Sequence, residues 1–258
     1  MKRYFTIIGL LTSLSFQRDV TYRFEALFTM FSIATYMATY IFSLQFTFQK
    51  ISSVAGYSYE ELYTLLLLGQ LWWFLNMVFA RKNFQNLMKQ INSGSLDFLL
   101  LKPIRWGWLI PFLEFDWRHV PAALVTLWLI LKQYNFELSL FQSINLVFFL
   151  TESMVLTFMI TKFFTALNFW VGRNTAIFDI TIELPFLVGL PAAFYVGFFK
   201  FLFLFVVPVV VIANPAFVIL SGRPAGWLFL QLTALTLIWT ILATLTWKRG
   251  LKNYVSAN

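Results

Sequence analysis

The chain has 258 residues, of which 60% are hydrophobic and only 12% are charged, which excludes a soluble globular protein because such a protein carries about twice that share of charge. Cysteine is absent, which excludes a disulfide framework and a thiolate metal site. A net charge of +8 could indicate nucleic-acid binding, but in so apolar a chain it indicates cytoplasmic loops that face anionic lipid.

The first predicted element is an amphipathic helix within residues 1–25, from Tyr4 to Arg23. Helices with one apolar face and basic residues lie on membrane surfaces, so we expect this one on the cytoplasmic interface. A mobile tail is the alternative. The apolar face recurs at helical spacing and consists of Ile7, Ile8, Leu11 and Leu14.

Long uncharged runs predict six transmembrane helices, because a helix needs about 20 apolar residues to cross a bilayer. Ser58 and Glu61 have the capping-box spacing just before the second run. We therefore expect an all-α, polytopic membrane protein with a single transmembrane domain over residues 1–258. The six predicted spans are residues 26–48, 62–80, 115–131, 140–160, 175–195 and 227–247.

The distribution of charge predicts how these spans are oriented. With both termini in the cytoplasm, fifteen of the 19 lysines and arginines fall on the cytoplasmic side and four on the other. Membrane proteins carry such an excess of Lys and Arg in their cytoplasmic loops. We expect a multi-pass protein that contacts membrane lipids, has both termini in the cytoplasm and binds no nucleic acid.

Residues 81–105 form the most distinctive polar segment. The first part predicts an amphipathic helix that ends at Gly94, and the apolar run 96–101 follows it. Apolar side chains in a cytoplasmic loop need a cover, and the two candidates are the lipid interface and a cytoplasmic partner. The apolar face of the predicted helix consists of Phe84, Leu87, Met88 and Ile91.

Polar residues gather at the start of the third predicted span. The single histidine of the chain, His119, has no companion of the kind that a metal site or a catalytic triad needs, so we expect a polar anchor at the membrane surface. A membrane-embedded enzyme or an assembly scaffold is a further hypothesis, because this is the one place where polar groups could converge. The group consists of Glu114, Asp116, Arg118 and His119.

Three acidic residues fall within predicted spans, where ionisable groups are costly and are candidates for function. Glu152 lies near the middle of the fourth span, and Asp179 and Glu183 share one face of the fifth. They are either structural, being protonated or hydrogen-bonded to a neighbouring helix, or they line a translocation path for cationic or amphipathic cargo. The second possibility allows a secondary transporter coupled to protons or ions, which predicts internal repeats with matched broken helices.

Residues 197–225 do not fit a simple count of spans. A seventh crossing would place Lys248 and Arg249 on the outer side, against the charge bias. Pro208 and Pro215 also interrupt the stretch, and proline breaks helices. We expect a re-entrant, broken helical hairpin before the last span, with one kinked seventh span as the alternative.

Two motifs resemble those of a known family. Residues 91–103, Ile91-x-x-Gly94-x-Leu96-Asp97-x-x-Leu100-Leu101-Lys102-Pro103, closely resemble the I-x-x-G-x-L-D-x-x-L-L-R/K-P signature of permease subunits of type-2 ABC transporters. Residues 247–254 resemble the W-R-R-G-L-R-R-Y ending of the same family. The resemblance covers nearly the whole chain and is strongest to the bacterial six-span exporter branch.

The resemblance implies a division of labour between chains. Two permease subunits, identical or related, would pair in the bacterial inner membrane, and separate cytoplasmic ABC ATPase subunits would bind ATP and magnesium. The sequence has no G-x-x-x-x-G-K-[ST] phosphate loop, so this chain itself is expected to be no enzyme and to hold no cofactor. A coupling helix within residues 81–101 would transmit closure of the ATPases to the spans. The residues implied in ATPase coupling are Phe84, Leu87, Met88, Ile91, Gly94, Leu96, Asp97, Leu100 and Pro103.

Overall fold

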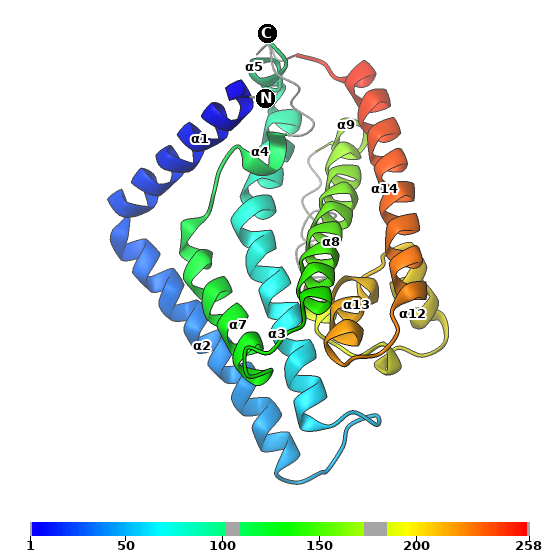
Figure 1. Ribbon diagram of the computed structural model, residues 1–258. Coiled ribbons are helices and arrows are strands. Elements are labelled where there is room, and N and C mark those ends of the chain that lie inside the picture. The colour runs from blue at the N-terminus through cyan, green and yellow to red at the C-terminus, as the bar shows by residue number, and fades with distance from the viewer. Residues whose placement is uncertain (1, 102–108, 173–184, 257–258) are drawn as a thin grey trace.

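The computed structural model describes residues 2–101, 109–172 and 185–256 (Figure 1). These residues are mostly helical and contain no β-strand, in agreement with the all-α prediction. Four segments are long and apolar enough to cross a membrane. They are α2 (Arg23–Phe48), α3 with α4 (Tyr59–Ser93), α8 with α9 (Leu140–Val171) and α14 (Gly226–Asn253).

Both ends of the chain lie at the same end of the helical bundle, next to α5 (Figure 1). The predicted N-terminal helix is α1 (Lys2–Thr21), which meets α2 at an angle. A π-helical turn, Met77–Arg81, joins α3 to α4 without a break. The individual bounds of the other helices are α3 Tyr59–Asn76, α4 Lys82–Ser93, α5 Asp97–Leu100, α7 Val120–Gln133, α8 Leu140–Ala166, α9 Asn168–Val171, α11 Pro185–Val188, α12 Gly197–Phe201 and α13 Val210–Leu220.

Two of the long helices begin at capping boxes, which satisfy backbone N–H groups that have no partner inside the helix. The Ser58 hydroxyl accepts from the Glu61 backbone N–H at 3.3 Å, and the Glu61 carboxylate accepts from the Ser58 N–H at 3.0 Å. This confirms the predicted start of α3. Ser139 and Gln142 make the same pair of contacts at the start of α8.

The first, second, fourth and sixth predicted spans are confirmed as long apolar helices. The third falls on α7, which has only 14 residues and starts late, directly before Pro121. At 1.5 Å per residue α7 is about 21 Å long, whereas a bilayer core is about 30 Å thick. Residues 175–184, about half of the fifth predicted span, lie outside the described residues. The other half, residues 185–195, contains only the short helix α11 and a 3₁₀ turn at Ala192–Phe194, so the count of six spans stays a prediction.

The proline-containing stretch before the last span is broken, as predicted. Residues Gly197–Val206 and Val210–Leu220 form two helical pieces that meet at 86°. Every residue of α13 except Val218 is buried. This agrees with the composition of α13, because a helix with apolar side chains on every face is expected to lie inside the protein. Asn214 ties α13 to the preceding turn, because its amide oxygen accepts from the Ala192 N–H at 3.4 Å and its amide nitrogen donates to Leu190 O at 3.3 Å.

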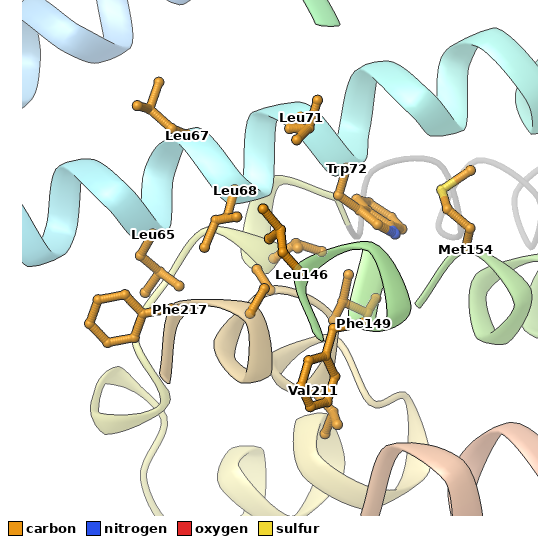
Figure 2. Packing of buried hydrophobic residues seen from close by; sticks show 14 of the residues in the cluster. Leu65, Leu67, Leu68, Leu71, Trp72, Leu146, Phe149, Met154, Val211 and Phe217 are labelled. Carbon is orange, nitrogen blue, oxygen red and sulfur yellow. The ribbon is translucent and has the colours of Figure 1, made fainter. Parts of the chain in front are cut away.

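The hydrophobic core lies where α3, α8 and α13 meet (Figure 2). Leu65 and Leu68 of α3 point toward side chains of α8 and α13, and the α3 and α8 side chains at the centre are almost fully buried. This core therefore connects the second and fourth predicted spans to the broken hairpin. Residues at its centre include Leu65, Leu68, Trp72, Leu146, Phe149, Val211 and Phe217.

Candidate functional site

The predicted amphipathic helix is α4, which lies at the end of the bundle that holds both termini (Figure 1). Its apolar face is buried, and the Phe84 side chain is only 1% exposed. Side chains of α8, α9 and α14 cover this face, so neither of the two expected covers, lipid or a partner, is required. The face, formed by Phe84, Leu87, Met88 and Ile91, packs with Phe158, Phe169, Trp247 and Leu251.

Gly94 ends α4 and reverses the chain into the short helix α5. Its φ is +68°, in the left-handed region that glycine adopts at no steric cost. The reversal leaves one side of α5 facing outward, with Phe98 67%, Leu100 43% and Leu101 81% exposed. We call these three residues the α5 face.

The C-terminal tail also holds α5 in place. The backbone N–H of Leu96 donates to the Tyr254 hydroxyl at 2.9 Å. The Ser256 hydroxyl donates to the carboxylate of Asp97. The described part of the first permease-like motif, residues 91–101, therefore meets the second, residues 247–254, although Leu96 and Tyr254 are 158 residues apart in the sequence.

A glycine of the C-terminal motif is required by close packing. A Cβ built on Gly250 would overlap the ring of Phe169. That ring has little room to move, because Trp247 and Tyr254 pack edge-on against it with centroids 5.4 and 6.2 Å away. The end of α14 can thus approach α9 and α5 only with glycine at this position.

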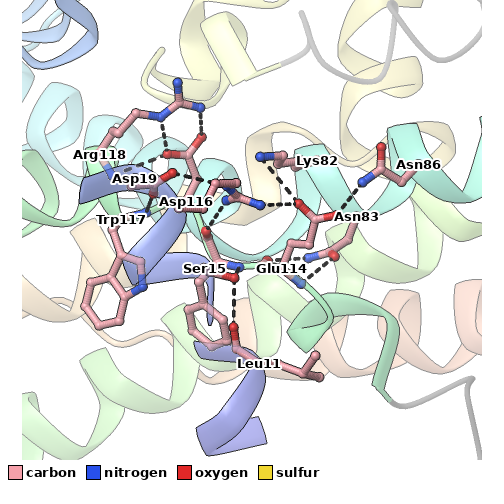
Figure 3. Close-up of polar contacts among 12 residues, drawn as sticks. Leu11, Ser15, Asp19, Lys82, Asn83, Asn86, Glu114, Asp116, Trp117 and Arg118 are labelled. Atoms are coloured by element: carbon pink, nitrogen blue, oxygen red, sulfur yellow. Dashed lines mark hydrogen bonds and ion pairs between the residues drawn. The ribbon is translucent and has the colours of Figure 1, made fainter. Parts of the chain in front are cut away.

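Glu114 is the centre of a polar cluster between α1, α4 and the segment before α7 (Figure 3). Its carboxylate binds Arg18 of α1 at 2.6 Å and, from α4, Lys82 at 3.4 Å and the Asn86 amide at 2.7 Å. Asn83 fixes the Glu114 backbone, accepting from its N–H at 2.9 Å and donating to its carbonyl at 2.8 Å. One side chain therefore joins the N-terminal helix to the helix that supports the α5 face.

Three further hydrogen bonds dock α1 on the same segment. The Phe115 N–H donates to the Ser15 hydroxyl, and the Trp117 N–H to the Asp19 carboxylate, both at 3.1 Å. The Trp117 indole N–H donates to the carbonyl of Thr12, also at 3.1 Å. The polar face of α1 is thus bound to the protein, while its placement on a membrane surface stays a prediction.

Asp116 and Arg118 complete the cluster. The Arg118 guanidinium binds both carboxylate oxygens of Asp116, at 2.7 and 2.6 Å, and reaches Glu25 of α2 at 2.8 Å. Burial alone raises the pKa of the Asp116 carboxyl, but nearby His119 and Arg118 outweigh it and hold that pKa well below its usual range. Because an unfolded Asp has a pKa of about 3.9, this contact contributes stability that is complete at neutral pH and is lost only in strong acid.

The prediction of a surface anchor at His119 is wrong, because the side chain is buried. Its Nδ1 lies 3.5 Å from Asp116, and its ring packs edge-on against Trp73 with centroids 6.1 Å apart. The acids of the cluster are paired with arginine or lysine, and no group of three metal-ligating side chains occurs among the described residues. The cluster therefore binds helices together rather than presenting a reactive group.

The three acids of the predicted translocation path are only partly described. Glu152 of α8 is half-buried and lies against Thr233 of α14. Its Oε2 atom has no hydrogen-bond partner within the described ranges. Asp179 and Glu183 lie outside the described residues, as does Pro103 of the implied coupling segment, so their part in a site stays a prediction.

Several pairings in this region carry no recognisable sequence signal. Arg18 and Glu114 are 96 residues apart, and Tyr254 and Leu96 are 158 apart. Pairs at such separations follow from helix packing and cannot be found by local periodicity. Phe98 and Leu101 did have a signal, because both belong to the apolar run that follows Gly94.

We expect Glu114→Gln to loosen α1. Glutamine keeps an acceptor for Asn86 but removes the charge that pairs with Arg18 and Lys82. Because partly exposed ion pairs contribute about 1 kcal/mol or less, hydrogen exchange of the α1 amides should accelerate by roughly fivefold. Mass spectrometry of the full chain in lipid nanodiscs measures this. Glu137→Gln, on an exposed loop, is the control, and equal exchange in the two variants would contradict the role of Glu114.

Comparison with known proteins gives one family. A family model described as ABC-2 family transporter protein matches residues 34–258. No curated protein and no solved structure matches the chain. The matched region starts within α2 and includes α4, α5 and the C-terminal tail.

Proposed function

The chain belongs to the ABC-2 family of transporters, and from this premise we propose that it is the permease subunit of an ATP-driven exporter whose ATPase is a separate chain. It is a multi-pass membrane component of an ABC transporter. We further propose that a second permease, identical or related, completes the translocation path, and that the pair lies in the bacterial inner membrane.

The observation that carries the proposal is the α5 face. Phe98, Leu100 and Leu101 are exposed at one end of the bundle, on a turn that contacts both α4 and the C-terminal tail. An exposed apolar patch on a rigid support is typical of a protein-binding site. We propose that the ATPase docks on this face.

The implied coupling residues then either belong to the docking turn itself or support it from inside the bundle. Asp97 belongs to α5 and is held by Ser256, and Leu100 contributes to the α5 face directly. Gly94 sets the turn between α4 and α5. The remaining described residues are buried and would transmit movement of α5 into the bundle by packing rather than by contact with the ATPase; they are Phe84, Leu87, Met88, Ile91 and Leu96.

The polar cluster connects α4 to other helices that could move with it. Glu114 links α4 to Arg18 of α1, so a displacement of α5 and α4 would be passed to the N-terminal helix. Arg118 links the same cluster to Glu25 at the start of α2. We propose that α1, the start of α2 and α4 move together when the ATPases close.

The proposed orientation places the α5 face and both termini in the cytoplasm. The excess of lysine and arginine on that side supports it, as does the position of both chain ends next to α5 (Figure 1). With residues 175–195 as the fifth span, the chain would cross six times. The 86° bend between Val206 and Val210, with α13 buried in protein, supports a re-entrant hairpin, since irregular backbone at membrane depth survives only inside protein or beside water.

Purification from native membranes tests this proposal. The tagged chain, extracted in mild detergent, should bring with it an ABC ATPase that mass spectrometry identifies and whose ATP hydrolysis is measurable in the purified assembly. A matched preparation from cells without the tag is the control. If no ATPase accompanies the chain, the proposed function is wrong.

A further inference from the structure

A pocket of about 620 Å³ lies at the end of the bundle opposite to the α5 face. The first turns of α3, the end of α7 and the end of α13 with the turn after it form its walls. This volume is within the range of about 300–1,000 Å³ that small-molecule sites occupy. No part of the ATPase-docking proposal uses this pocket.

The charges around the pocket leave one carboxylate without an opposite charge. Glu61 forms an ion pair with Arg223 at 2.7 Å. The Lys132 ammonium lies over the ring of Trp128, 5.1 Å from its centroid, and Trp128 does not line the pocket. Glu60 is exposed and makes no ion pair with any described residue. The lining therefore holds two acidic and two basic side chains, and Glu60 is its one carboxylate without an ion pair among the described residues.

Aromatic rings stand beside this carboxylate. The rings of Tyr59 and Tyr63 stack with centroids 5.7 Å apart and planes only 10° apart. Burial raises the pKa of the Tyr134 phenol, and the carboxylates of Glu60 and Glu61 add to the increase against a hydrogen bond with Thr64. The lining thus holds a stacked pair of tyrosines and a third tyrosine, Tyr134, that lies near the charge of both glutamates.

Hydrogen bonds hold the walls in place. The Gln133 amide donates to the Thr64 hydroxyl at 2.7 Å and to the carbonyl of Glu60 at 3.0 Å, which ties the end of α7 to the first turns of α3. The Oε1 atom of Gln133 is buried and has no partner in the part of the chain that the structure describes. Two of the three helices that form the pocket are therefore fixed to each other, with a free acceptor atom beside them.

We propose that this pocket binds an organic cation, with the positive group beside Glu60 and the apolar body against the tyrosine rings. A carboxylate attracts the charge, and the faces of aromatic rings add cation–π attraction that neutral or anionic ligands lack. The apolar lining from Leu129, Phe217 and Leu220 suits a hydrophobic cation rather than a small hydrated ion.

Tetraphenylphosphonium is a suitable probe, because tetraphenylborate has nearly the same size and shape with the opposite charge. Isothermal titration of the full chain in lipid nanodiscs should give saturable binding of the phosphonium and none of the borate above that of empty nanodiscs. Glu60→Gln should weaken phosphonium binding about tenfold, the order expected for one charge pair near a protein surface.

Glu137→Gln is the matched control, since Glu137 is exposed on the neighbouring loop and does not line the pocket. Its affinity should stay within about twofold of the original. The proposal is overturned if the phosphonium does not bind, if the borate binds equally, or if Glu60→Gln has no larger effect than Glu137→Gln. Because the titration uses this chain without an ATPase, its outcome is independent of the test of the exporter proposal.

Discussion

Gly69→Ala is expected to destabilise the protein by about 1–3 kcal/mol, although alanine favours a helix more than glycine does. A Cβ built on Gly69 of α3 would lie 2.6 Å from the Cα and 2.8 Å from the backbone nitrogen of Gly189. Both are backbone atoms, which cannot rotate away as a side chain can. The two segments would have to separate, and the core around Leu65 and Trp72 would lose contact. Unfolding in detergent, followed by tryptophan fluorescence, measures the loss.

The reciprocal substitution is the control. A Cβ on Gly189 would meet its nearest atom, Leu65 O, at 3.5 Å, which is an ordinary contact. Gly189→Ala should therefore change stability by less than about 1 kcal/mol. Gly226→Ala, at the start of α14 with nothing within 4 Å, should be neutral or slightly stabilising. Equal losses for Gly69→Ala and Gly189→Ala would show that the close approach of these segments is not as described.

Leu101→Asp is expected to weaken ATPase association about 30-fold or more, since a residue at the centre of a docking site contributes about 2 kcal/mol. Leu101 is 81% exposed, so the substitution removes little contact within the chain. A carboxylate there would have to lose its water on docking. Phe98→Asp, at a position that is 67% exposed, should act in the same direction. Interferometry with the co-purified ATPase and the permease in nanodiscs measures both affinities.

Two comparisons separate loss of docking from loss of folding. Phe136→Asp changes a residue that is 59% exposed at the other end of the bundle, where φ is +59° and aspartate is tolerated, and it should leave ATPase affinity unchanged. Leu96→Asp changes a residue that is 1% exposed and should destabilise the fold itself. Unchanged affinity in both Leu101→Asp and Phe98→Asp would remove the α5 face from the proposed interface.

Local features of this protein follow from the sequence. Apolar runs placed α2, α3, α8 and α14 within a few residues of their observed bounds, since a helix long enough to cross a bilayer requires such a run. The capping pair Ser58 and Glu61, the amphipathic face of α4 and its end at Gly94 were predicted for the same reason, because each depends on residues within about one helical turn. The break near Pro208 follows from the chemistry of proline.

Only the tertiary structure decided what covers these elements. From the sequence, the apolar face of α4 could be covered by lipid or by a partner. In the structure α8, α9 and α14 bury this face, whereas Phe98 and Leu101 of the following apolar run are exposed. His119 was expected at the surface, but helix packing buries its side chain against Trp73. Helical periodicity specifies which side chains share a face, but the partner of that face is set by helices that are distant in the sequence, and their approach depends on the fit of whole surfaces.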